Sequence, residues 1–224
     1  NSFLGLCHSM AHKLGAMFVV QGGRANALVR RHIIKYNAVD CPKKQANDPI
    51  AREKMHYAAT IAGMAFANSF LGLCHSMAHK LGAMFHVPHG VANALLFRQI
   101  IKYNAVDCPK KQAIFPQYKF PNAKAKYGQI ADELGLGGKN DDEKVELYIK
   151  AIEDLMKKIN LPFSIKEFGV TEEDFNAKLD EMVELAFDDQ CTGANPAYPL
   201  MEDIKAIYLD AFNGVVRDYY PTKK

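Results

Sequence analysis

Two segments of the chain are nearly the same sequence, and this repeat limits what the chain can fold into. Residues 1–46 and 68–113 align without gaps at an offset of 67, with 39 of the 46 positions identical. Natural repeat arrays have shorter periods and diverge much further. We therefore interpret 1–46 as a near-identical duplicate of 68–113, degenerate or artefactual, and place the folded domain in 47–224.

The two copies differ where the second one carries histidines. His86, Pro88 and His89 of the second copy correspond to a valine, a glutamine and a glycine in the first. The first copy contains the residues at the start of this motif but lacks those at its end. We expect the chemistry of the motif to belong to the second copy.

The rest of the chain has a helical pattern. Apolar residues recur with a helical period from Asp48 onward, and strand-like alternation is nearly absent. Asp48 precedes Pro49 as an N-cap precedes a first helical residue, and Thr171 and Asp174 are spaced as a capping pair. The sequence predicts an all-α domain. The expected helices cover 51–85 with a break near 68–72, 90–103, 123–134, 141–158, 171–187 and 201–213.

Composition excludes several classes of function. The net charge is +3, and no stripe of lysine and arginine interleaved with aromatic residues is present, so we expect no nucleic-acid partner. No apolar run reaches the length of about 18 residues that a membrane helix needs, so we expect no membrane partner. Four of the five cysteines are two repeated pairs, which argues against a disulfide framework and favours the reducing cytoplasm.

The histidines are strongly clustered. All eight lie at or before position 89, and four fall between His75 and His89. His75 and His79 share a helix face, and His89 follows Pro88, where a turn can bring it back to the same point. A single histidine on a small-residue helix is more often a core residue, but this cluster favours a metal or catalytic site. Convergent imidazoles with a carboxylate suit Fe²⁺ or Zn²⁺, and the spacing alone does not choose between them.

Three stretches of the chain carry a family resemblance. The runs Gly63–Asn68, Cys74–Ala94 and Phe187–Pro196 resemble the iron-dependent (group III) alcohol dehydrogenase family. The likeness is greatest to the C-terminal alcohol dehydrogenase half of bacterial bifunctional aldehyde/alcohol dehydrogenases, and it runs from about 47 to 213.

The resemblance implies a fold and a site. It implies an all-α metal-binding domain that normally follows a Rossmann-like nucleotide-binding domain, with a metal held by one aspartate and three histidines. On that pattern His75 and His89 are metal ligands, and His79 is the catalytic histidine beside nicotinamide and substrate. Phe66 and Cys191 line the substrate pocket. The implied cofactors are Fe²⁺, with Zn²⁺ as an alternative, and NAD(H).

The sequence departs from the family pattern in two places. The family's other aspartate and histidine ligands come from an upstream Asp-x-x-x-His helix, and neither Asp40 nor Asp48 has a histidine four places on. The Gly-Gly-Gly-Ser phosphate-binding signature is also missing. We therefore expect half of a metal site, no nucleotide-binding domain in this chain, and no assignable cofactor-binding residues.

Three functions stay open at this point. The resemblance implies a fermentative, homo-oligomeric dehydrogenase that interconverts a small primary alcohol such as ethanol and its aldehyde. A non-catalytic helical packing module would explain the missing ligands and the repeat. A metal-storage or redox-sensing role would use the Cys-His pairs at 7–8 and 74–75. Stabilisation by added metal separates the first function from the second.

Overall fold

The computed structural model describes residues 48–50, 53, 56–57, 60, 62–63, 71–106 and 123–219. The repeat copy 1–46, the pocket residue Phe66 and most of the predicted break at 68–72 lie outside the described residues.

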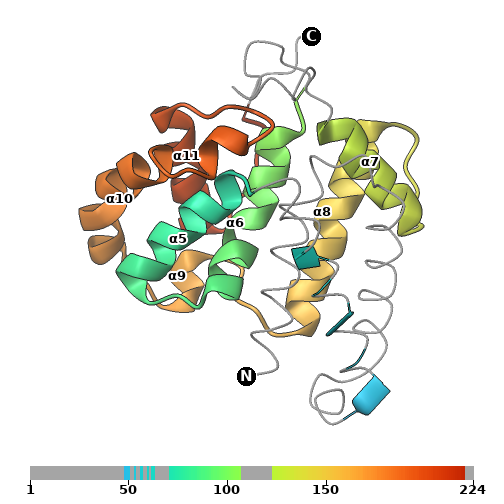
Figure 1. The fold of residues 1–224 in the computed structure, drawn as a ribbon, viewed down its shortest axis with the longest axis horizontal. Coiled ribbons are helices and arrows are strands. Elements are labelled where there is room, and N and C mark those ends of the chain that lie inside the picture. Colours follow the sequence, from blue (N-terminus) through green and yellow to red (C-terminus); the bar gives the residue numbers. More distant parts are fainter. Residues whose placement is uncertain are drawn as a thin grey trace.

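The elements of the described part are all helices, which confirms the all-α prediction (Figure 1). The predicted helices beyond residue 89 match the observed ones to within one residue at each end. The structure has α5 (Leu73–Phe85), α6 (His89–Asn104), α7 (Ala123–Glu133), α8 (Asp141–Lys158), α9 (Ile165–Phe168), α10 (Glu172–Phe187), the 3₁₀ helix η2 (Thr192–Ala194) and α11 (Met201–Asn213).

The predicted helix starts have the expected caps. The Asp48 carboxylate accepts a hydrogen bond from the Ile50 amide at 2.9 Å, beside helical Pro49. The Thr171 hydroxyl accepts from the Asp174 amide at 3.1 Å and caps α10. Side-chain oxygens at these positions satisfy amides that have no partner inside the helix.

Two short helices were not predicted, α9 and η2. The single turn of α9 is too short to show an apolar period, although its ends carry local signals. The Ser164 side chain caps it by accepting from the Glu167 amide, and Gly169 ends it with a left-handed φ of 114°. Such ends are recognisable in a sequence only when the helix between them is already suspected.

A short turn sends the chain from α5 back along α6. His86 ends α5 with a left-handed φ of 54°, and Pro88 precedes α6 with φ −55° and ψ 135°. Proline favours a helix start because it has no amide hydrogen to lose there. The first residue of α6, His89, therefore lies beside α5.

The helices pack in two groups that meet at α6. Helices α5, α6, α10 and α11 pack against one another with α9 and η2, and the α7–α8 pair joins them through contacts of α8 with α6 (Figure 1). Phe175 of α10 and Phe212 of α11 stack with ring centres 4.3 Å apart. The shared core excludes water and includes the fully buried side chains Leu73, Met77, Leu81, Leu95, Ile101, Met182, Ile204 and Ile207.

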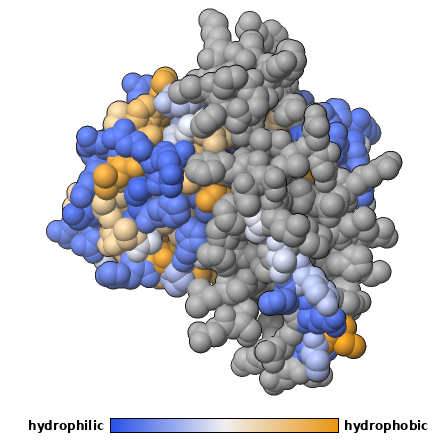
Figure 2. Space-filling model, in the orientation of Figure 1, coloured by the Kyte–Doolittle hydropathy of each residue, from blue (hydrophilic) through white to orange (hydrophobic). Residues whose placement is uncertain are grey.

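The described surface is mixed in character. On the face shown in Figure 2, hydrophilic residues cover much of the described surface around α5, α10 and α11, and apolar residues form small separate patches. Among the described helices, none has the length and apolar character needed to cross a membrane.

A buried arginine joins α6 to α8 and to the segment before α9. The Arg98 side chain is 2% exposed and pairs with Glu153 at 2.9 Å. Its other terminal nitrogen donates to the Phe163 carbonyl, and its guanidinium lies 5.2 Å from the centre of the Phe163 ring. A buried charge is tolerated when it is paired and hydrogen-bonded in this way.

We expect Arg98→Met to lower the free energy of unfolding by about 1–3 kcal/mol, because the Phe163 carbonyl loses its donor while most of the side-chain volume remains. The measurement is the urea midpoint at an unchanged denaturant slope. The control is Lys166→Met, since Lys166 is 62% exposed and lies 3.9 Å from Glu172. That variant should stay within about 0.5 kcal/mol of the wild type. Equal losses in the two variants would contradict the role of Arg98.

Candidate active site

Three histidine rings gather where α5 meets α6. His75 and His79 lie one turn apart on α5, and His89 opens α6. The ring centre of His89 is 5.3 Å from that of His75 and 5.4 Å from that of His79, and the two α5 rings are 6.1 Å apart. The structure therefore brings together the three histidines that the sequence singled out.

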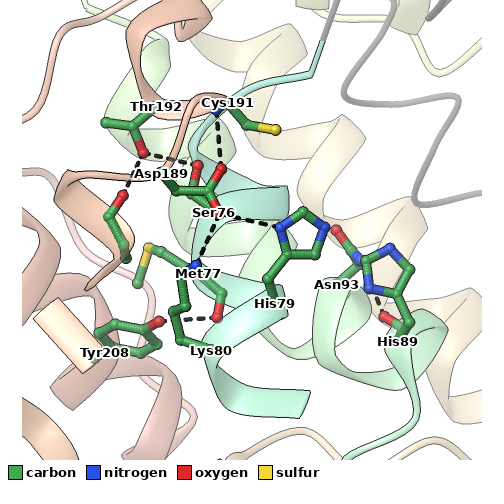
Figure 3. Close-up of polar contacts among 11 residues, drawn as sticks. Ser76, Met77, His79, Lys80, His89, Asn93, Asp189, Cys191, Thr192 and Tyr208 are labelled. Atoms are coloured by element: carbon green, nitrogen blue, oxygen red, sulfur yellow. Dashed lines mark hydrogen bonds and ion pairs between the residues drawn. The ribbon is translucent and has the colours of Figure 1, made fainter. Parts of the chain in front are cut away.

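The three rings differ in exposure. His75 is fully buried, whereas the side chain of His79 is 39% exposed. The rings of His79 and His89 are nearly parallel, at 17° (Figure 3). The cluster therefore runs from the protein interior at His75 to solvent at His79.

The spacing of the rings is compatible with a shared metal ion. An imidazole nitrogen about 2.1 Å from a metal places the ring centre about 3 Å from it, so two rings on one ion have centres at most about 6 Å apart. The separation of 5.3 Å between His75 and His89 meets this condition. Nitrogen ligands of this kind suit Fe²⁺ and Zn²⁺.

Asn93 supports the His89 ring from the next turn of α6. Its amide nitrogen donates to the His89 carbonyl at 2.9 Å and lies 3.2 Å from His89 Nε2. Asn93 is fully buried, and its backbone carbonyl accepts a hydrogen bond from the Cys74 thiol at 3.6 Å. The α6 face beside the cluster is therefore polar and ordered by hydrogen bonds.

Asp189 is the acidic group that reaches the cluster. One carboxylate oxygen, Oδ1, accepts from the Cys191 amide at 2.9 Å. The other, Oδ2, accepts from Lys80 Nζ at 2.9 Å and lies 3.2 Å from His79 Nδ1 (Figure 3). Burial acts to raise the pKa of this carboxyl, but the Cys191 amide, Lys80 and His79 together lower it to about 2. Asp189 is therefore ionised at neutral pH.

The two described cysteines have protonated thiols. Burial raises the pKa of Cys74 to about 12, and burial together with the Asp189 charge raises that of Cys191 to about 12. The thiolate is the reactive form of cysteine, so neither side chain suits redox sensing. The other Cys-His pair considered for that role, at 7–8, lies outside the described residues.

A loop from Asp189 to Asn195 runs antiparallel to α5 and contacts it in steps of three residues. Asn195 Oδ1 accepts from the Leu73 amide at 3.2 Å. The hydroxyl oxygens of Thr192 and Ser76 are hydrogen-bonded at 2.7 Å. The Asp189 contacts to the next turn of α5 complete the series (Figure 3). We call these contacts, made from the three loop residues Asn195, Thr192 and Asp189, the α5 ladder.

Asn195 also connects the loop to the end of α6. Its amide nitrogen donates to Asn104 Oδ1 at 2.7 Å and to the Ala197 carbonyl at 2.6 Å. A Cβ atom at Gly72 would lie 3.0 Å from Asn195 Oδ1, so the close approach of the loop to α5 favours glycine there. The side chain of Asn195 is buried with these partners around it.

Sequence reasoning missed Asp189, Lys80, Asn93 and Asn195. Asp189 and Asn195 lie within the stretch 187–196 that carries the family resemblance, which was the available signal. Nothing in that stretch alone tells which side chains face α5. Phe66, the other predicted pocket residue, lies outside the described residues.

Comparison with known proteins shows to which family the chain belongs. It matches the Fe-containing alcohol dehydrogenase family, C-terminal, over residues 1–47 and again over residues 43–212. The chain belongs to the iron-containing alcohol dehydrogenase family. Both copies of the repeat therefore lie within matched residues, and the resemblance noted in the sequence is confirmed.

Several iron-containing alcohol dehydrogenases and their relatives are similar to this chain. It is 54% identical over 176 residues to the bifunctional aldehyde-alcohol dehydrogenase AdhE of Escherichia coli, covering 78% of this chain and 20% of that protein. Identity to the aldehyde-alcohol dehydrogenase of Clostridium acetobutylicum is also 54%, over 182 residues, covering 81% and 21%. The chain spans about a fifth of the length of these relatives.

A solved structure confirms the fold. The iron-containing alcohol dehydrogenase from Thermococcus thioreducens matches with a TM-score of 0.75 at 30% identity, covering 94% of this chain and 50% of that one. The helices described above are therefore those of the helical domain of the iron-containing alcohol dehydrogenase fold.

We expect Asn195→Ala to lower the free energy of unfolding by about 2–4 kcal/mol, because several buried polar groups lose their partner at once. Urea denaturation measures the loss. The matched control is Asn213→Ala, since Asn213 is exposed and its side chain donates to the Leu209 carbonyl within its own helix. If both variants unfold at the same urea concentration, the hydrogen bonds of Asn195 do not stabilise the fold.

Proposed function

We propose that this chain forms the metal-binding, substrate-facing part of a metal-dependent alcohol dehydrogenase. The proposed reaction interconverts a small primary alcohol and its aldehyde with a nicotinamide cofactor. The observation that carries the proposal is the meeting of three imidazoles between α5 and α6, in a chain of this family. The named activities of similar proteins support it, including an NADPH-dependent butanol dehydrogenase of Clostridium saccharobutylicum, 38% identical over 177 residues.

His75 and His89 are the proposed ligands of a divalent ion, Fe²⁺ by family and Zn²⁺ as the alternative. When bound, the ion supplies Lewis-acid polarisation of the alcohol oxygen. Burial of His75 limits the motion of its ring, and Asn93 contacts the His89 ring from the same helix. Ligand rings that are held by neighbouring groups bind a metal with less loss of entropy.

His79 is the proposed proton relay between alcohol and solvent. Its ring lies against that of His89 and its side chain is 39% exposed, so it can contact both the reacting site and water. Imidazole exchanges protons efficiently near neutral pH. The nicotinamide supplies the hydride chemistry of the reaction.

Cys191 and Phe66 are the proposed walls of the substrate pocket. The Cys191 side chain is 2% exposed and close enough to His79 and Asp189 for one ligand atom of each to lie within 4.8 Å of the others. As a protonated thiol it presents a small, weakly polar surface. Such a surface beside the relay suits a small alcohol.

We expect Fe²⁺ or Zn²⁺, added to the metal-free protein at about 100 times its Kd, to stabilise the native state by about 2.7 kcal/mol. For a chain of this size that corresponds to a rise in Tm of about 5–10 °C. The rise should disappear in His75→Ala and His89→Ala. It should persist in His86→Asn, because His86 is exposed and asparagine tolerates its left-handed backbone. Absence of any rise would favour the non-catalytic packing module.

We expect His79→Phe in the full-length, metal-loaded protein to reduce kcat for alcohol oxidation by about 100-fold or more, because the relay is lost while an aromatic ring is kept. Steady-state kinetics with a small primary alcohol and NAD or NADP measure this. Metal content should match that of the wild type, since the proposed ligands are unchanged. Unaltered turnover and an unaltered pH profile would remove the relay from the mechanism.

A further inference from the structure

The Asp189 carboxylate is held at both oxygens, and the proposed function gives it no task. Oδ1 accepts from the Cys191 amide at 2.9 Å, which fixes the plane of the carboxylate. Oδ2 receives Lys80 Nζ at 2.9 Å and faces His79 Nδ1 at 3.2 Å. Only 9% of the side chain is exposed. Holding a buried carboxylate in one orientation costs conformational entropy, so the orientation of Asp189 toward His79 needs an explanation.

The chemistry of the contact sets the tautomer of His79. The pKa of Asp189 is lowered to about 2, so at neutral pH its oxygens are acceptors only. A hydrogen bond to Oδ2 therefore requires a hydrogen on His79 Nδ1. In a neutral imidazole the other nitrogen, Nε2, then carries the free lone pair. One contact thus decides both where the ring points and which nitrogen can accept a proton.

We propose that Asp189 is a positioning residue for His79, which it holds in the Nδ1–H tautomer so that Nε2 is the proton-accepting nitrogen of the relay. The inference rests on the proposed function for the purpose of this arrangement, but the tautomer itself can be observed without turnover. Through Oδ1 the same carboxylate places Cys191, so the relay and one wall of the pocket share a single anchor.

Lys80 and the rest of the α5 ladder support this role. The Lys80 ammonium shares Oδ2 with His79, and its positive charge balances the carboxylate beside the imidazole. The adjacent contact, between Thr192 and Ser76, fixes the loop one helical turn away without touching His79. The loop therefore has an independent attachment to α5, and the orientation of His79 can be tested separately from the folding of the loop.

The same neighbourhood allows one other use, a metal site formed by His79, Asp189 and Cys191, whose ligand atoms lie within 4.8 Å of one another. One observation weighs against it. The Lys80 ammonium already occupies Oδ2, and a cation there would have to displace it.

The decisive variant is Asp189→Asn in the full-length protein. The asparagine oxygen can still accept from the Cys191 amide, so the loop keeps its anchor. Its NH₂ group then faces His79 Nδ1 and cannot accept from it, which should switch the ring to the Nε2–H tautomer. Long-range ¹H–¹⁵N spectra of the metal-free and zinc-loaded protein, with His79 assigned through His79→Phe, report the tautomer. An unchanged Nδ1–H signal in Asp189→Asn overturns the proposal.

Kinetics supply the second readout. Asp189→Asn should lower kcat by about 10- to 100-fold, the usual effect of losing a supporting partner, with the KM for alcohol changed less than about threefold. The matched control is Ser76→Ala, which removes the neighbouring contact of the α5 ladder and should keep both the tautomer and kcat. An equal loss of kcat in Ser76→Ala, or a tautomer switch with unchanged kcat, shows a merely structural role and overturns the proposal.

The failure of this proposal and the failure of the proposed function look different. If His79→Phe keeps full turnover while Asp189→Asn still switches the tautomer, the relay is wrong and the hydrogen bond is right. If His79→Phe is inactive and the tautomer does not switch, the relay stands and Asp189 does not set it. Zinc titration of the wild type and Cys191→Ser decides the metal alternative. A second tight ion that is lost in Cys191→Ser overturns the positioning role.

Discussion

The geometry of the site depends on hydrogen bonds between α5 and a loop that lies more than a hundred residues further along the chain. Asn195 and the Leu73 amide, which open the α5 ladder, are 122 positions apart. Closing so long a loop costs entropy, and each hydrogen bond adds only about 0.5–1.5 kcal/mol of net stability. The apolar core between α5, α10 and α11 adds further stability and brings the loop to α5. Apolar packing far from the imidazoles is therefore what places polar groups beside them.

Local signals made much of this structure predictable. The ends of the helices could be predicted from prolines, capping residues and apolar periods. The meeting of His75, His79 and His89 could be predicted from helical spacing and from the turn at Pro88. The partners of His79 were not predictable in the same way. Asp189 lies 110 positions away, and no local spacing reports a contact that only tertiary packing creates. One-turn helices were missed for the related reason that four residues cannot show a period.

The two copies of the repeat differ at the residues that bring an imidazole from α6 into the cluster. The family match includes the first copy, at 1–47, as well as the second. In the first copy a glutamine and a glycine, Gln21 and Gly22, replace Pro88 and His89. The sequence of the first copy therefore lacks both the proline that starts α6 and the imidazole that α6 brings to the cluster. Near-identity over the remaining positions does not restore that arrangement, because two substitutions remove the turn residue and the imidazole together.

The three-residue spacing of the α5 ladder also bears on how such a loop can evolve. A single insertion or deletion between Asp189 and Asn195 would move at least one anchor away from its partner on α5, because the helix allows no compensating shift. Substitutions between the anchors are less restricted, as at Gln190, whose side chain is exposed. Natural variation in this loop should therefore appear as changes of residue type at constant length, and its length should be retained even where its composition has drifted.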